Sequence, residues 1–156
     1  NEFGLTEVEG AGITVILDDN QLGAQAANSG DLNLYIIHYE NILSVVNDLK
    51  QGGAKAIAIN GLRLVTTSEI RCVGNTILVN TTRLAPPYEI QAIGNAANLE
   101  NALLSAGNAQ SYSTLKMLNF PVSYTTTSPN NPSITIPAYA GSVTTKYLTP
   151  AADTKE

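Results

Sequence analysis

The chain is poor in several residue types, and each shortage narrows what the protein can be. It holds one cysteine, so no disulfide can form within it. Tryptophan is missing, and tyrosine outnumbers phenylalanine seven to two, which favours aromatic side chains at the rim over a bulky aromatic core. Eight basic residues stand against 13 acidic ones. Because no basic stripe exists to neutralise phosphates, we do not expect nucleic-acid binding.

Long hydrophobic runs are also missing. No apolar run approaches the roughly 20 residues that a membrane helix needs. The first residues are polar and acidic, unlike a signal peptide. With 156 residues, the chain is long enough to bury most of its apolar surface as one domain. We expect a single domain over residues 1–150 and a disordered polar tail over residues 151–156.

The most regular stretch is residues 57–94, which has the pattern of strands joined by tight turns. Asn60-Gly61 and Gly74-Asn75 are hairpin signals, because both residue types tolerate a positive φ. Pro86-Pro87 interrupts the pattern, since proline cannot donate to a ladder. The predicted strands are residues 55–59, 62–65, 69–73, 76–80 and 88–93. Their alternation is typical of an antiparallel sheet with one solvated face.

Three helices are predicted outside that stretch. Residues 40–51 carry apolar side chains at the spacing of one helical face, and Gly52-Gly53 ends the pattern. Asn95 or Asn98 can cap a second helix over residues 98–106. A third covers residues 111–119. The side chains expected to face inward are Ile42, Val45, Val46, Leu49, Leu99, Ala102, Leu103, Ala106, Tyr112, Leu115 and Leu118.

The remaining segments complete the predicted fold. Residues 13–17 and 34–37 have the composition of strands, and the small, polar segment 20–33 between them is expected to be a flexible loop. Residues 122–127 are predicted to form a hairpin with residues 134–136. The order of strands and helices favours an α+β fold. We predict a ferredoxin-like sandwich: a mainly antiparallel sheet with the helices on one face, and an added hairpin.

One constellation near the start of the chain has the residue types of a metal site. Asp18, Asp19, His38 and Glu40 would provide oxygen and nitrogen ligands if the first two strands lay side by side. The spacing matches no known metal motif. The simpler interpretation is a turn at a strand end and the start of a helix, where acidic side chains suit the helix dipole.

Two adjacent residues, Arg71 and Cys72, are expected to have opposite environments. Side chains alternate along a strand, so Ile70 and Cys72 should face the helices and be buried, while Arg71 lies on the open face. Cys72 with His38 has the residue types of a nucleophile pair, although a core cysteine is the more common situation. Arg71 suits a carboxylate, either that of Glu69 nearby or that of a partner.

The order of these features resembles DUF881, a bacterial domain family of unknown function. The most specific match is Ile70-Arg71-Cys72-Val73-Gly74-Asn75-Thr76. Other matching segments include Leu17-Asp18-Asp19, Ile37-His38, Ile59-Asn60-Gly61, Pro86-Pro87-Tyr88 and residues 134–139. In the family an acidic residue more often follows the histidine, whereas this chain has Tyr39 and then Glu40. This departure weakens any site built on that acidic position.

The resemblance implies an extracytoplasmic domain of a membrane-anchored protein. Family members carry an N-terminal transmembrane helix and a coiled coil, which would precede Asn1. The family is associated with cell-envelope and division gene neighbourhoods of Gram-positive bacteria, without an established activity. The missing coiled coil would supply dimer contacts, so we expect only weak self-association of this chain.

Two classes of function remain open. The first is a non-catalytic interaction or scaffold domain that binds protein partners of the envelope or division machinery. The second is a domain that senses a small ligand near His38 and the loop of residues 19–31. A pocket at His38 would favour sensing, and a flat uncovered face would favour interaction. We expect no enzyme activity, no cofactor and no bound metal, because no activated nucleophile or acid–base pair is recognisable.

Overall fold

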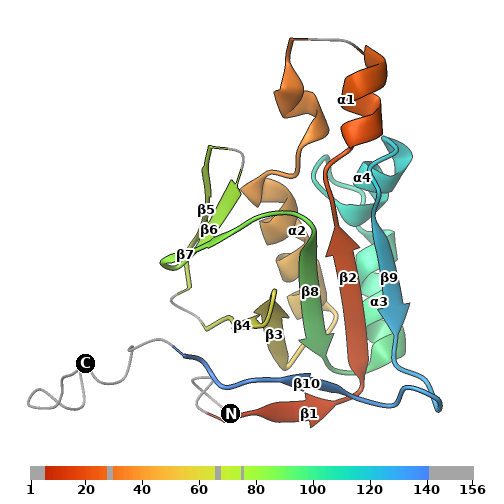
Figure 1. The fold of residues 1–156 in the computed structure, drawn as a ribbon. Helices are drawn as coiled ribbons and strands as arrows, with labels where there is room; N and C mark the ends of the chain where they lie inside the picture. Colours follow the sequence, from red (N-terminus) through yellow and green to blue (C-terminus); the bar gives the residue numbers. More distant parts are fainter. Residues whose placement is uncertain (1–5, 28–29, 66–67, 75, 141–156) are drawn as a thin grey trace, which may run out of the picture.

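The centre of the computed structural model, which describes residues 6–27, 30–65, 68–74 and 76–140, is a five-stranded antiparallel sheet (Figure 1). The two middle strands pair over their full length, from Gly12 opposite Ile93 to Leu17 opposite Tyr88. The strand order is β4 (Leu62–Arg63), β3 (Ala56–Ile59), β8 (Tyr88–Ile93), β2 (Gly12–Leu17) and β9 (Ser123–Thr126).

The chain follows the path β2–α2–β3–β8–α3–β9 through this sheet. Helices α2 (Tyr39–Gln51) and α3 (Ala96–Ser105) cover the same face (Figure 1). The two helices pack so closely that a Cβ added at Gly52 would lie only 2.8 Å from the Cβ of Ala102. The prediction of an α+β, ferredoxin-like sandwich is therefore confirmed. None of the helices within the described residues has the length and apolarity to cross a bilayer.

The helical faces follow the predicted apolar spacing, with one exception. Ile42, Val45, Val46 and Leu49 are buried in α2, as are Leu99 and Leu103 in α3. The cap of α3 is Asn95, whose side chain accepts a hydrogen bond from the backbone of Asn98 at 2.9 Å. The short helix α4 (Tyr112–Met117) buries Tyr112 and Leu115, but Leu118 is 55% exposed. The inward prediction for Leu118 is wrong because the helix ends at Met117, two residues before the predicted end, and Leu118 is its C-cap.

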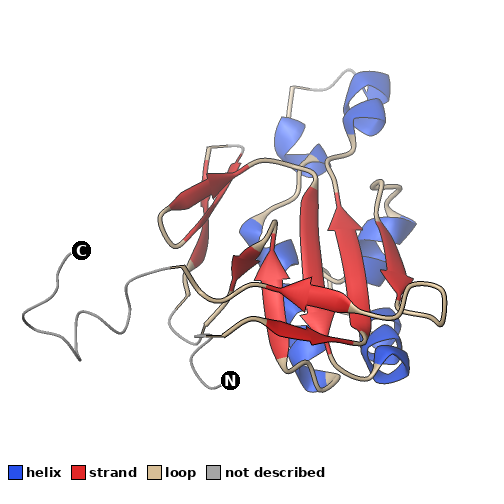
Figure 2. Ribbon diagram, turned by 60° about the horizontal axis from the view of Figure 1, so that its bottom comes forward, coloured by secondary structure: helices blue, strands red, loops and turns tan. Residues whose placement is uncertain are grey.

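A two-stranded ribbon covers the face of the sheet opposite the helices (Figure 2). It pairs β1 (Val8–Gly10) with β10 (Ile134–Ile136), the two ends of the domain. The predicted hairpin of β9 with residues 134–136 is wrong, because β9 pairs with β2 and the chain then crosses to the other face. The isoleucines of β10 become buried there against Ala56, Ala58 and Ile93, which explains the crossing.

The segment between β4 and β8 forms a separate three-stranded antiparallel sheet beside α2 (Figure 1). Its strands are β5 (Ile70–Val73), β6 (Thr76–Val79) and β7 (Thr82–Leu84). The first two were predicted as strands and the third was not. Ile77 and Val79 are buried in the main core. This small sheet, rather than a hairpin, is the main addition to the ferredoxin-like core.

The segment after β2 differs from both predictions made for it. Instead of a loop and a strand, it contains helix α1 (Gln21–Ala27) and the 3₁₀ helix η1 (Leu32–Tyr35). Two capping interactions explain the turns: Asn20 Oδ1 accepts from the Gly23 backbone at 3.0 Å, and Asp31 Oδ1 accepts from the Asn33 backbone at 3.1 Å. No residue of α1 is buried. The predicted tail of residues 151–156 lies outside the described residues.

Candidate functional site

The end of the molecule that carries α1 (Figure 1) and η1 is here called the apical end, and Asp18, Asp19 and His38 of the predicted site lie close together there. Asp18 and Asp19 follow β2 directly. Asp19 Oδ1 accepts a hydrogen bond from the Ile37 backbone at 2.7 Å, and this bond joins the end of β2 to the start of α2. Asp18 Oδ1 accepts from the Asp19 backbone at 2.8 Å. The two acidic residues therefore have structural roles in turns, as the simpler interpretation expected.

Burial changes the acidity of Asp19. Desolvation raises the pKa of its carboxyl, and the charge of Asp18 raises it further. The Ile37 hydrogen bond and the nearby His38 act in the opposite direction, with smaller effect than the desolvation. The outcome is a carboxylate that is partly removed from water and would gain from a cationic or hydrogen-bond-donating partner.

His38 lies at the N-cap position of α2. Its backbone donates to Asn41 Oδ1 at 2.8 Å, and its Nε2 lies 2.8 Å from the carbonyl oxygen of Asn33 in η1. A carbonyl can only accept, so Nε2 carries the proton in this contact. His38 therefore ties η1 to α2. Glu40, in the first turn of α2, is exposed.

Cys72 is exposed, which contradicts the prediction that it is buried. The prediction that the Cys72 side chain points toward the helices is correct. Its Sγ accepts a hydrogen bond from the backbone of Tyr39, the first residue of α2, at 3.3 Å. The burial prediction is wrong because β5 belongs to the small outer sheet instead of the central one. Arg71 is exposed as predicted. Among the described residues, no hydrogen bond or ion pair joins Arg71 to Glu69 or to the apical acids.

Tyr88, at the start of β8, was missed by the sequence reasoning. Its side chain is fully buried, and its hydroxyl is enclosed without a hydrogen-bond partner among the described residues. Burial raises the pKa of this phenol, and the nearby carboxylates of Asp19 and Asp18 add to the effect. Tyr88 pairs with Leu17, the residue before Asp18, so the start of β8 lies beside the apical end of β2. The alternating pattern of residues 88–93 predicted a strand but did not indicate a buried hydroxyl at Tyr88.

Two shallow hollows open at the apical end. One, of about 270 Å³, is lined by Asp18, Asp19, Asn20, Gln21, Leu22, Asn119 and Pro121. The other, of about 360 Å³, lies beside the first turn of α2 and is lined by His38, Glu40, Asn41, Ala109 and Gln110. Within the part of the chain that the structure describes, no three His, Cys, Asp or Glu side chains converge to hold a metal.

Several large apolar side chains on α1, η1 and α4 are exposed, and one of them, Leu22, lines the first hollow. Leu22 on α1 is 80% exposed, and Leu32 and Leu34 on η1 are 58% and 65% exposed. Met117 and Leu118 at the end of α4 are 73% and 55% exposed. These five residues are here called the apical surface. The sequence reasoning missed it because segment 20–33 was predicted to be a loop, although its two leucines, Leu22 and Leu32, were a signal.

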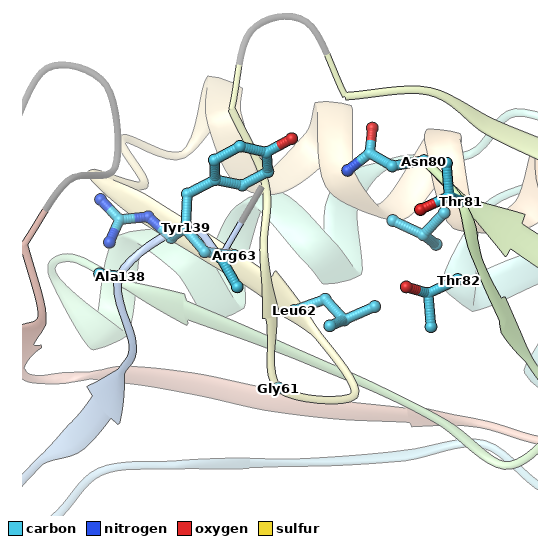
Figure 3. A pocket seen from close by; sticks show the side chains of 10 residues that line it. Gly61, Leu62, Arg63, Asn80, Thr81, Thr82, Ala138 and Tyr139 are labelled. Carbon is cyan, nitrogen blue, oxygen red and sulfur yellow. The ribbon is translucent and has the colours of Figure 1, made fainter. Parts of the chain in front are cut away.

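A further pocket, of about 170 Å³, lies away from the apical end (Figure 3). Three segments enclose it: the turn between β3 and β4, the turn between β6 and β7, and residues 138–140 after β10. Figure 3 shows Tyr139 in the middle of this group, with Thr81, Thr82 and Asn80 on one side and the Arg63 guanidinium on the other. No sequence motif indicated this pocket.

Together these observations define a class of protein: an α+β domain with an antiparallel sheet, an exposed apolar surface at one end, and a small polar pocket at its edge. Comparison with known proteins then gives the family. The model of the family described as "Bacterial protein of unknown function (DUF881)" matches residues 1–149, and the chain belongs to this family, as the resemblance implied.

Two relatives support this assignment. The chain is 39% identical over 77 residues to the UPF0749 protein YlxW of Bacillus subtilis (strain 168), a match that covers 49% of this chain and 32% of that protein. The matched region thus spans about a third of the length of that relative. A crystal structure of an uncharacterized conserved protein from Mycobacterium tuberculosis superposes with a TM-score of 0.68 at 25% identity, covering 88% of this chain and 85% of that one.

Proposed function

We propose that this chain is a non-catalytic interaction domain of a membrane-anchored, extracytoplasmic envelope protein, and that it binds a protein partner through the apical surface. The main observation that supports this proposal is the apical surface itself. Large apolar side chains that are exposed together at one end of a domain are typical of an interaction site. Helix α1 buries none of its residues, so it adds nothing to the core.

The position of the apical surface supports docking at a distance from an anchor. In Figure 1, α1 and β1 lie at opposite ends of the molecule. A membrane anchor that preceded β1 would therefore leave the apical surface pointing away from the bilayer. This arrangement suits a domain that presents a docking surface to partners in the envelope or the division machinery.

The charges at the apical end favour a different protein over a second copy of this chain. Asp18, Asp19 and Asp31 lie next to the apolar side chains of α1 and η1. Two apical surfaces placed face to face would bring these carboxylates together at a cost. A partner with apolar side chains flanked by lysine or arginine would complement them. Weak self-association of the isolated chain remains our prediction.

The absence of catalysis is part of the proposal. The Cys72 thiol is in contact with the Tyr39 backbone, and the His38 ring is in contact with Asn33. The two side chains of the suspected nucleophile pair thus have separate partners. A general base must lie within hydrogen-bond reach of the group that it activates.

Photo-crosslinking in living cells tests the proposal. A photoreactive amino acid would replace Leu22 or Leu34 in the full-length protein, with exposed Thr135 of β10 as the control position at the opposite end. We expect the same crosslinked partner from both leucine positions and none from Thr135. Crosslinks from Thr135 alone would contradict the proposal. Leu22→Ser and Leu34→Ser together should abolish binding of the partner in the cell, while the melting temperature of the purified domain stays unchanged.

A second candidate function, small-ligand sensing near His38 and residues 19–31, is favoured by one observation. The enclosed Tyr88 hydroxyl has no partner among the described residues, and buried hydroxyls without partners are uncommon. NMR titration with pooled polar metabolites would test it, with Tyr88→Phe as the matched variant. Sensing requires amide shifts at Asp19 and His38 that Tyr88→Phe abolishes. Shifts that persist in Tyr88→Phe, or no shifts, would exclude this site.

A further inference from the structure

Arg63 is a buried cation that pairs with no acidic side chain among the described residues. Its side chain is 4% exposed. Nη1 donates to the carbonyl oxygens of Thr6 and Pro137, at 3.1 and 3.2 Å. Both acceptors are neutral, and Nε and Nη2 have no hydrogen-bond partner within the described residues. Buried charges in proteins are normally paired. Burial without such a pair lowers the pKa of the guanidinium.

The pocket beside Arg63 has the composition that an anion would require. None of the described residues that line it is acidic. Thr81, Thr82 and Tyr139 contribute hydroxyl groups, and Leu62 contributes an apolar surface. The Asn80 side chain has a fixed position at the side of the pocket, because its Oδ1 accepts a hydrogen bond from the Glu69 backbone at 3.0 Å. Three segments distant in sequence form the pocket, so it exists before any ligand binds.

We propose that this pocket binds a small oxyanion, a carboxylate or phosphate compound, whose negative end pairs with the Arg63 guanidinium. The guanidinium fork is suited to such groups because its N–H donors match two oxygens at once. The volume of about 170 Å³ is close to that of cavities that hold benzene, so the ligand is of that size. This site is independent of the apical surface.

The geometry assigns a position to each part of the ligand. Figure 3 shows the Arg63 guanidinium on one side of the Tyr139 side chain and Thr82 on the other. A ligand that reaches both lies along the Tyr139 ring. Its anionic end faces Arg63, its body packs on the ring and Leu62, and a polar group at its other end meets the Thr82 hydroxyl.

The rival explanation is that Arg63 only clamps the chain. Thr6 precedes β1 and Pro137 follows β10, and Val8 pairs with Ile136, so the two carbonyl contacts fasten both strands at one end of the ribbon to the edge of the main sheet. A clamp needs no ligand. The two explanations differ in whether Arg63 responds to added anions, and a direct spectroscopic signal from its side chain can separate them.

Nitrogen-15 NMR of the arginine Nε–H groups provides that signal. The chain has three arginines, and Arg71 and Arg83 are exposed internal controls. Inorganic phosphate, acetate and benzoate would be titrated separately at constant ionic strength. We expect the Arg63 signal to shift and saturate at millimolar concentrations, while the other two shift weakly and without saturation. A shift with phosphate alone, or with carboxylates alone, assigns the chemical class. If all three arginines respond alike, or Arg63 does not respond, the proposal fails.

Two variants protect this test from a folding artefact. Arg63→Lys keeps the charge and removes the fork, but it also weakens the clamp. Thr82→Val is nearly isosteric, and Thr82 is exposed at the first position of β7, so the fold should persist. We expect Thr82→Val to weaken benzoate binding by about two- to tenfold, the effect of one lost hydrogen bond. Unchanged affinity in Thr82→Val together with unchanged affinity in folded Arg63→Lys would overturn the proposal.

Discussion

Asp48, on α2, allows a sharp test of the packing between the two main helices. Its side chain is 8% exposed, and Oδ2 is enclosed without a hydrogen-bond partner among the described residues. Residues four apart share a helix face. Ser44 contacts Asn108, beyond the end of α3, and Gly52 packs on α3. Asp48 lies between them on that face and therefore points at the α2–α3 interface.

The perturbation is Asp48→Asn, which keeps the shape and removes the charge. An unsatisfied buried polar group costs about 1–3 kcal/mol, and the amide retains part of that cost. We therefore expect the variant to be more stable at pH 7 by about 1 kcal/mol, which raises the melting temperature by about 2–4 °C. Glu69→Gln, at an exposed position, is the matched control and should change nothing measurable.

The pH dependence gives the prediction a second readout. Desolvation raises the pKa of Asp48 above its ordinary value. The folded state therefore prefers the protonated acid, so this group favours folding most at pH values below its unfolded pKa of about 4. That contribution is lost as the pH rises through the raised folded pKa. Urea denaturation should show the advantage of Asp48→Asn at neutral pH and its disappearance near pH 4. A variant less stable than wild type at pH 7 would refute the reasoning, since it would mean that the carboxylate has a partner.

Three further predictions concern single contacts. Gly12→Ala would place a Cβ 1.9 Å from a carbonyl oxygen of β8. Chemical denaturation should therefore show that the free energy of unfolding falls by at least about 2 kcal/mol. Gly107→Ala, with open space around it, is the control and should leave the stability nearly unchanged. Tyr124 donates to Glu100 Oε2 at 2.6 Å, and a double-mutant cycle with Tyr124→Phe and Glu100→Gln should give a coupling of about 1 kcal/mol; a coupling near zero would mean that solvent replaces the bond. Cys72 should react with a thiol reagent in the native state nearly as fast as in urea, and strong native protection would contradict its exposed position.

The core of this fold was predictable because its signals are local. The four apolar residues of α2 recur at helical spacing, and Asn60, in the turn before β4, has a φ of 48°. That value fits the Asn-Gly hairpin signal. The strands β3 and β8 were bounded by turns and proline. Each of these patterns depends on a few consecutive residues, so it can be recognised without knowledge of the rest of the chain.

The errors arose where long-range packing decided the outcome. Ile134 and Ile136 carry a strand pattern, but no local signal says that their partner is β1, 124 to 128 residues earlier in the chain. Cys72 alternates correctly with Arg71, yet its exposure depends on whether β5 joins the main sheet. Periodicity gives the direction of a side chain, while burial also depends on what lies opposite it.

The candidate sites were the hardest features to predict, and their place in the topology explains why. Both lie in segments added to the β2–α2–β3–β8–α3–β9 core. The apical surface comes mainly from α1 and η1, between β2 and α2, and the Arg63 pocket comes from the insertion between β3 and β8 together with the chain after β10. Core positions are constrained by packing, whereas connecting segments are free to carry binding residues. Substitutions such as Leu34→Ser or Thr82→Val should therefore change binding without unfolding the domain. The same separation would let one scaffold hold the proposed docking surface at one end and the proposed ligand pocket at its edge.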